Sequence, residues 1–304
     1  MQLRSYCTIA LTSLLASSMN AQSVTWRVDN VTNIGGLPVA KYGNPQVVST
    51  PYGNAVQFNG INDGLRVPTN PLAGMTNMTV EMIFRHDPLT VPDAWQPRIV
   101  HIQATPTDHR LTLETRVNTN TTPHTFVLDT FLKLGNTAGV NNATLTNGSF
   151  PHPVGEWSHM AITYNGTAFK NYVNGREELS TNISGTTFAT PGNTWIGQRS
   201  NNINYFQGQV LALRFTPRAL ATNEFMNVPA TRLEVPSVSD GNAQLDFELT
   251  SGLPASFRLL QAANLAGPWS TNDAAVLTTN SPGISYRFTT ATSGNSQFYR
   301  VQSP

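Results

Sequence analysis

Polar and apolar side chains alternate along four stretches of the chain, and the polar types suit ligand binding. The stretches are MTVEMIFR (78–85), RIVHIQ (98–103), RLTLETRV (110–117) and TFVLDTF (125–131). Successive side chains of a β-strand point to opposite faces, so the apolar residues would take the core and leave the polar residues on the other face. If the four strands share a sheet, one face gathers Glu81, Arg85, His101, Gln103, Arg110, Glu114, Arg116 and Asp129.

This polar face has two interpretations, which the sequence leaves open. Carboxylates and guanidinium groups bond sugar hydroxyls or acidic groups, which predicts a saccharide groove. The same side chains suit a solvated sheet face, on which opposite charges pair across strands and contribute roughly 0.2–1 kcal/mol per pair. The groove stays open as an interpretation because a chain with only 12% charged residues concentrates so many of them there.

An enzyme is the alternative to simple binding. Glycoside hydrolysis uses two carboxylates beside the scissile bond, and the candidates Glu81, Glu114 and Asp129 lie on three different stretches. A lyase would need a base such as His101 near an arginine that neutralises a uronate. The expected function is non-catalytic binding of a carbohydrate or a surface partner, with a polysaccharide-active hydrolase or lyase as the alternative. A purely structural surface module is the third class.

A loop ahead of the last long strand adds candidates. IGQRSNNINYF (196–206) carries Arg199, Asn201, Asn202 and Tyr205, and loops on a rigid sandwich are common ligand sites. An Asn-rich loop is also typical of an ordinary turn. The six histidines of the chain are scattered without the spacing of metal ligands, so no zinc site is expected.

Short alternating runs separated by turn residues must position these side chains. The predicted strands are AVQF (55–58), LRV (65–67), the four stretches above, WSHMAITY (157–164), AFKNYV (168–173), TWIG (194–197) and QVLALRF (209–215). Asn165-Gly166 suits a hairpin turn between the strands at 157–164 and 168–173. So many strands without helices predict an all-β, two-sheet antiparallel sandwich. Only LATNEFMN (220–227) suggests a short helix, capped by Thr222.

Composition and the N-terminal segment limit the classes of binding partner and the cellular compartment that fit this protein. The formal net charge of the 304 residues is +1, which argues against nucleic acid or an anionic membrane as the main partner and favours a neutral polar ligand. Residues 1–21 have a basic start, an apolar run and a small-residue cleavage site, as in an export signal. Removal of this segment takes away Cys7, the only cysteine. We therefore expect a secreted, cell-surface or periplasmic protein without disulfides.

Two modules are expected after the signal. The first spans residues 22–228, a proline-containing segment at 229–239 would be a linker, and residues 240–304 carry a second set of strands. These strands are predicted at AQLDFEL (243–249), SFRLLQA (256–262), AVLTT (275–279), ISYRFTT (284–290) and QFYRVQ (297–302). Their spacing is typical of a small β-sandwich.

Six ordered segments carry a family likeness: AVQFNGINDGLRVP, MTVEMIFR, GEWSHMAITYNGTAFKNYVNGRE, TWIGQRSN, YFQGQVLALRFTPRAL and NEF. They resemble the laminin-G-like domains of the concanavalin A-like lectin/glucanase superfamily. The resemblance implies a jelly-roll of two sheets, whose concave face commonly holds the carbohydrate. It also implies that the strands at 157–164 and 168–173 are the family's central hairpin, with Trp157 as its buried anchor. The tail, through LQAANLAGPW and FYRV, loosely resembles small β-sandwich modules of secreted bacterial proteins. Fold alone does not decide function, because the superfamily includes lectins, glycanases, lyases and adhesion modules.

The same resemblance implies calcium as the candidate ion. Asp63 lies in a segment where the family places an acidic residue, and calcium prefers oxygen ligands. The last strand departs from the family pattern, since Leu211 stands where an Asp is usual. Loss of that carboxylate should weaken a divalent site, and Asp63 could equally support a turn.

Overall fold

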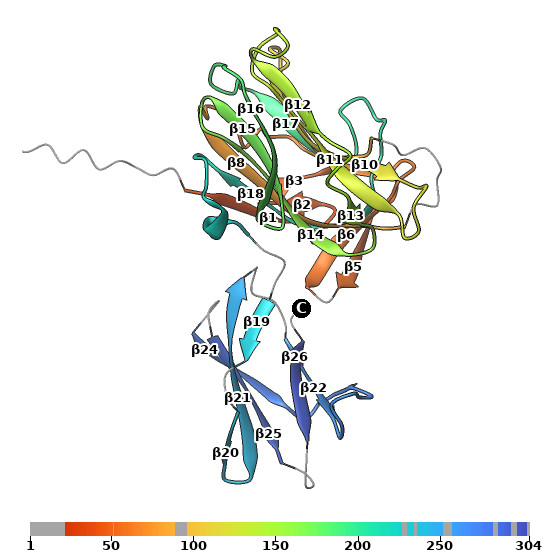
Figure 1. The fold of residues 1–304 in the computed structure, drawn as a ribbon, viewed down its shortest axis with the longest axis vertical. Helices are drawn as coiled ribbons and strands as arrows, with labels where there is room; N and C mark the ends of the chain where they lie inside the picture. The colour runs from red at the N-terminus through yellow and green to blue at the C-terminus, as the bar shows by residue number, and fades with distance from the viewer. Residues whose placement is uncertain are drawn as a thin grey trace, which may run out of the picture.

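Two antiparallel sheets of eight strands form the first body of the protein (Figure 1). The computed structural model describes residues 22–50, 52–88, 96–226, 230–233, 236–251, 257–281, 285–292 and 297–302. The predicted export signal and Cys7 lie outside these residues. The expected all-β, two-sheet sandwich is confirmed.

The first sheet has the strand order β16-β15-β14-β8-β18-β6-β5, and β1 pairs with β18. Its strands are β1 (Val24–Arg27), β5 (Gln46–Thr50), β6 (Gly53–Asn59), β8 (Met78–His86), β14 (Trp157–Tyr164), β15 (Ala168–Val173), β16 (Arg176–Asn182) and β18 (Gln207–Thr216).

The second sheet has the order β12-β11-β10-β9-β17-β7-β4, and β13 pairs with β11. Its strands are β4 (Ala40–Tyr42), β7 (Gly64–Val67), β9 (Arg98–Ala104), β10 (Arg110–Asn118), β11 (Thr125–Lys133), β12 (Asn142–Thr146), β13 (His152–Pro153) and β17 (Gly192–Ile196). A small hairpin of β2 (Asn33–Ile34) and β3 (Leu37–Pro38) stands apart from both sheets.

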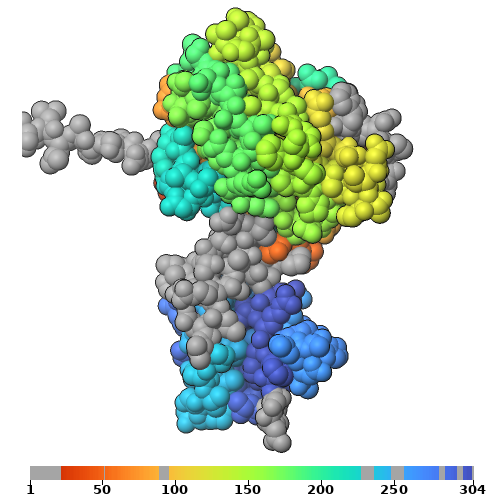
Figure 2. Space-filling model, viewed as in Figure 1, coloured from red at the N-terminus to blue at the C-terminus, as the bar shows by residue number. Residues whose placement is uncertain are grey.

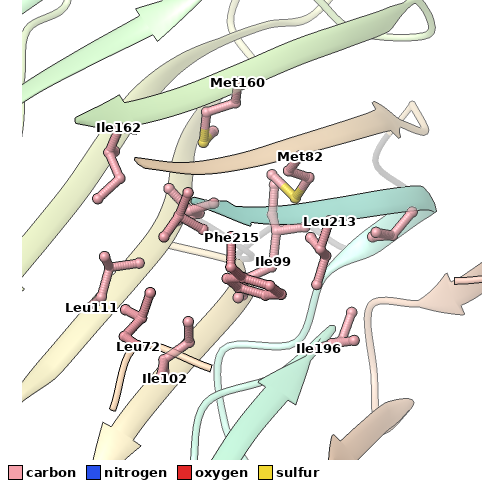
Figure 3. Close-up of a cluster of buried hydrophobic side chains, with 14 of the residues drawn as sticks. Leu72, Met82, Ile99, Ile102, Leu111, Met160, Ile162, Ile196, Leu213 and Phe215 are labelled. Carbon is pink, nitrogen blue, oxygen red and sulfur yellow. The ribbon is translucent and has the colours of Figure 1, made fainter. Parts of the chain in front are cut away.

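One hydrophobic core fills the space between the two sheets (Figure 3). The first sheet contributes Met82, Met160, Ile162, Leu213 and Phe215, and the second contributes Ile99, Ile102, Leu111 and Ile196. Apolar residues at every second position give each strand one face that can be buried, which is why these sequences form sandwich strands. The other face of each sheet is left for polar groups.

The predicted hairpin is confirmed, but its turn and its anchor differ from expectation. Tyr164 pairs with Phe169 across β14 and β15, and the Asn165 side chain accepts backbone hydrogen bonds inside the connecting loop. Trp157 is not in the core. It lies on the outer face of β14, partly exposed, and packs edge-on against Tyr52 with ring centroids 5.6 Å apart.

The second Asn-Gly pair forms the tighter turn. Asn174 and Gly175 have φ angles of 48° and 78° and join β15 to β16, where Val173 lies opposite Arg176. Both turn residues need positive φ in a type I′ turn, which Asn and Gly tolerate.

A short 3-10 helix, η1 (Thr222–Glu224), follows β18. Its N-cap residue is Ala221 rather than the predicted Thr222, and the Glu224 carboxylate accepts a hydrogen bond from the Ala221 N–H at 3.0 Å. In the part of the chain that the structure describes, no helix has the length and apolar character to cross a membrane.

The C-terminal strands form two further sheets, coloured from cyan to blue in Figures 1 and 2. The strands are β19 (Ala230–Leu233), β20 (Ser237–Ser239), β21 (Asn242–Ser251), β22 (Arg258–Ala262), β23 (Ser270–Thr271), β24 (Val276–Ser281), β25 (Ser285–Ala291) and β26 (Phe298–Gln302). Part of the predicted linker is strand, because β19 and β20 both pair with β21. Leu245, Phe247, Leu259 and Phe288 belong to a separate core.

Candidate functional site

A cavity of about 210 Å³ opens on the outer face of the second sheet. Its lining comes from β9 to β12, from the residues before β9 and from the loop after β17. The lining residues are Gln96, Arg98, His101, Arg110, Thr112, Glu114, Arg116, Asp129, Phe131, Thr144 and Arg199.

Strand register places a row of side chains across the base of this cavity. Thr112 on β10 lies opposite His101 on β9 and Phe131 on β11, and Phe131 lies opposite Thr144 on β12. Neighbouring strands are about 4.7–4.9 Å apart, so residues in one row are close neighbours. The row combines an imidazole, two hydroxyl groups and an aromatic ring.

Glu114 is held by two neighbours. The register of β9 and β10 shifts between Leu113 and Glu114, which brings Glu114 opposite Arg98. The carboxylate forms an ion pair with the Arg98 guanidinium, and its Oε1 accepts a hydrogen bond from Thr112 Oγ1 at 3.2 Å. Both members of the ion pair are largely buried, with side-chain exposures of 12% for Arg98 and 5% for Glu114. A buried charge without its partner would be costly, so each residue keeps the other in place.

A second ion pair joins β10 to β11, two residues after Glu114 along β10. Arg116 Nε donates to Asp129 Oδ2 at 2.7 Å. The Asp129 side chain is 2% exposed, whereas that of Arg116 is 43% exposed. The other carboxylate oxygen of Asp129, Oδ1, is buried and has no hydrogen-bond partner among the described residues. Asp129 therefore offers an unused acceptor in the lining.

A chain of hydrogen bonds fixes the protonation of His101. Lys133 Nζ and Gln103 Nε2 both donate to the carboxylate of Asp108, at 2.7 and 2.6 Å. This leaves the carbonyl Oε1 of Gln103 as the acceptor for His101 Nε2 at 3.1 Å. Burial, with a smaller contribution from nearby arginines, lowers the pKa of His101 to about 3, so the ring is neutral and carries its proton on Nε2. Nδ1 is a buried acceptor without a partner among the described residues.

Two more arginines complete the lining. The Arg110 guanidinium lies 5.0 Å from the centroid of the Phe131 ring, in a cation–π contact. Arg199 comes from the loop after β17, in a turn closed by a hydrogen bond from Asn202 N–H to Arg199 O at 3.0 Å. Burial lowers the pKa of Arg98 to about 10, and the positive charge of Arg199 contributes to this shift. Arg199 is therefore close enough to act on the ion-pair residues.

Comparison with protein families shows the family to which this sandwich belongs. A laminin-G-type family model of the concanavalin A-like lectin/glucanases superfamily matches residues 59–224. The chain belongs to this superfamily. The resemblance seen in the sequence is thus confirmed, over a region that runs from the end of β6 to η1.

Solved structures similar to this superfamily member include domains of larger proteins. Domain 4 of AbnA, a GH43 extracellular arabinanase from Geobacillus stearothermophilus in complex with arabinotriose, is 20% identical, with a TM-score of 0.49, over 66% of this chain and 93% of that one. A Trypanosoma rangeli sialidase mutant displaying trans-sialidase activity is 14% identical, with a TM-score of 0.46, over 66% and 31%. The botulinum neurotoxin DC binding domain in complex with rat synaptotagmin II is 11% identical, with a TM-score of 0.47, over 84% and 79%. A search of curated proteins finds no match.

Six of the residues expected from the sequence line the cavity: His101, Arg110, Glu114, Arg116, Asp129 and Arg199. Gln103 lies behind this lining, as the partner of His101. Asn201 is exposed and does not line the cavity. The sequence interpretation missed Gln96, Arg98, Thr112, Phe131 and Thr144. Alternation along β10 and β11 gave a signal for Thr112 and Phe131, which share a face with the chosen residues.

The prediction that Glu81 and Arg85 join this face is wrong, because β8 belongs to the first sheet. Glu81 is fully buried on the outer side of that sheet. Its Oε1 accepts the backbone N–H of Met226 at 2.6 Å, and its Oε2 accepts Arg214 Nε at 2.5 Å. Glu81 thus ties the segment after β18 to the sheet. Arg85 pairs with Asp87 at 2.7 Å.

Asp63, the candidate calcium ligand, supports a turn. Its Oδ1 accepts the Asn44 N–H at 2.7 Å and its Oδ2 accepts the Asn59 N–H at 3.1 Å, which joins the turn before β5 to the end of β6. Among the described residues no three His, Cys, Asp or Glu side chains are grouped so that they could hold a metal ion. Calcium takes six to eight oxygen ligands. One carboxylate with both oxygens already engaged does not fit that requirement.

Proposed function

We propose that this protein binds a glycan outside the cytoplasm, without chemical conversion, through the cavity on the second sheet. One observation carries the proposal: buried polar groups converge with the aromatic ring of Phe131 in a hollow of about 210 Å³. Ligand pockets are typically concave and combine apolar surface with a few fixed polar groups. The export-type N-terminus favours a place outside the cytoplasm.

The unused acceptors give this cavity a reason to bind hydroxyl groups. His101 Nδ1 and Asp129 Oδ1 are buried without partners among the described residues. A buried acceptor that stays unpaired costs about 1–3 kcal/mol, which a ligand hydroxyl would recover. The volume is below the roughly 300–1,000 Å³ of pockets for drug-sized ligands. It therefore suits one sugar unit of a longer glycan.

Catalysis is the weaker proposal, and the contacts in the cavity explain why. Glu114 Oε1 accepts Thr112 Oγ1 and its Oε2 pairs with Arg98, so neither oxygen is free to act on a glycosidic bond. His101, with a pKa of about 3, is too weak a base to remove a carbon-bound proton at neutral pH. Among the described lining residues, Asp129 alone keeps a carboxylate oxygen without a hydrogen-bond or ion-pair partner, whereas glycoside hydrolysis uses two carboxylates, so the cavity favours recognition.

A glycan array tests this proposal when the same polysaccharides are also assayed for cleavage. With the chain from residue 22 onward, we expect saturable binding and neither new reducing ends nor the absorbance of an unsaturated lyase product. Product formation would establish the alternative enzyme. Absence of binding to every glycan would contradict the proposal and leave binding of another surface partner or a structural role.

A further inference from the structure

The charges around the cavity do not balance. Among the described residues, Arg98, Arg110, Arg116 and Arg199 line it together with two carboxylates, Glu114 and Asp129. His101 adds no charge because its ring is neutral. The described lining therefore carries a formal surplus of two positive charges, although the net charge of the whole chain is only +1.

The surplus can be assigned to particular residues. Glu114 and Asp129 are engaged by Arg98 and Arg116. Among the described residues, the carboxylate that pairs with Arg110 is that of Asp108, 3.7 Å from Nη1, and Asp108 also pairs with Lys133 at 2.7 Å.

Arg199 has no side-chain hydrogen bond or ion pair with any residue that the structure describes. Together with Arg110, it supplies the uncompensated charge.

These two arginines also act on each other. The pKa of Arg110 is lowered, chiefly by burial and further by the charge of Arg199. Like charges held close together in a partly buried site are relieved when an anion enters, and guanidinium groups match carboxylates and sulfates through paired N–H donors. The contact with Phe131 restricts Arg110 and so prepares it for such a ligand.

We propose that the sugar unit bound in the cavity is anionic, bearing a carboxylate or a sulfate ester, and that Arg110 and Arg199 bind its charged group. This inference rests on the proposed glycan binding and names the class of glycan. It also revises the expectation of a neutral ligand, which followed from the net charge of the chain. A net charge near zero for the whole chain does not describe the electrostatic field at one site on its surface.

Matched glycan pairs test the inference with the chain from residue 22 onward. Oligogalacturonides and their methyl esters differ in the carboxylate charge, and sulfated galactan oligosaccharides and their desulfated forms differ in the sulfate. We expect at least tenfold weaker binding of the neutral member in one of these pairs. The pair that shows the difference identifies the charged group.

Two variants extend the test. Arg199→Gln should weaken binding of the acidic member about 10- to 100-fold, the effect of losing a charge-assisted contact. It should leave the melting temperature unchanged, because its side chain has no partner to lose in the described structure. Arg176→Gln is the matched control, since it removes the same charge from the exposed start of β16 in the first sheet.

The outcomes separate this inference from the function on which it rests. Equal binding of acidic and neutral members, or an unchanged affinity of Arg199→Gln for the acidic member, would overturn the anionic ligand while glycan binding stands. Absence of binding to the matched pairs and to every other glycan of the array would overturn both.

Discussion

Arg98 and Glu114 form an ion pair across β9 and β10 at the point where the register between these strands shifts. By simple alternation Arg98 would share the core face with Val100 and Ile102, which belong to the hydrophobic cluster. Because the register shifts here, the Arg98 guanidinium lies on the cavity side instead. A bulge that re-aims one side chain thus shapes the site.

Removal of Glu114 should destabilise the fold. Glu114→Ala leaves the Arg98 guanidinium largely buried without its carboxylate, so we expect a loss of roughly 3 kcal/mol in the free energy of unfolding. Urea titration measures it. Glu177→Ala is the control, because Glu177 and Lys170 form an exposed pair worth under about 1 kcal/mol. Equal small losses in both variants would contradict the buried pair.

Phe84 and Trp157 should differ in their contributions to stability. Phe84 is fully buried between the sheets and its ring packs against Phe126 at 5.6 Å, so Phe84→Ala should cost about 3–5 kcal/mol. Trp157 is partly exposed on an outer face, and Trp157→Ala should cost about 1–2 kcal/mol. Thermal or urea unfolding of both variants checks the order. A larger loss for Trp157→Ala would show that the register of β14 is wrong.

Stability should fall as the pH falls below 6.5. Burial lowers the pKa of both His86 and His101 from 6.5 to about 3, so between these values the unfolded chain binds more protons than the folded one. Each histidine contributes up to about 1.4 kcal/mol per pH unit in this window. In urea titrations at pH 6.5 and 5.5, the loss of stability on acidification should be smaller in His101→Gln than in the parent by about 1 kcal/mol. An unchanged dependence would mean that His101 is accessible to protons in the folded state.

Calcium removal should have little effect. Both oxygens of Asp63 already accept backbone N–H groups, so a chelator should leave the melting temperature nearly unchanged. Asp63→Asn should lower the melting temperature equally with and without chelator, because it weakens a turn rather than a metal site. A fall of more than about 10 °C on chelation of the parent protein would require oxygen ligands beyond those described.

The alternation of polar and apolar residues and the types of the turn residues predicted the sandwich well. Both patterns depend only on residues close together in the sequence. All ten strands expected between residues 55 and 215 are present, since each carries an apolar face of its own. The alternation of polar and apolar residues also predicted which side chains of β10 and β11 face away from the core. It could not assign β8 to a sheet, because Glu81 alternates in the same way whichever neighbours its strand pairs with.

Other parts of the site depend on pairing that no local pattern shows. Arg98 reaches the cavity where the strand register shifts, and Thr144 reaches it from β12, a strand with a single buried apolar residue, Leu145. Trp157 was misplaced because its core position was inferred from the family likeness and not from the alternation of its own strand. Met160 and Ile162 are buried and mark the core face of β14. Trp157 alternates with them and therefore lies on the other face.

The central claim is that a glycan occupies the cavity on the second sheet. Thr144 is exposed at the cavity wall, so Thr144→Trp should fill the space without disturbing the core. Ser180→Trp is the control, because Ser180 is exposed on β16 at the edge of the other sheet. Both variants should keep the parent melting temperature.

Calorimetric titration with the glycan that the array selects provides the most direct measurement. We predict that Thr144→Trp weakens binding at least 100-fold while Ser180→Trp binds as the parent does. Parent-like affinity in a folded Thr144→Trp variant would contradict binding in this cavity.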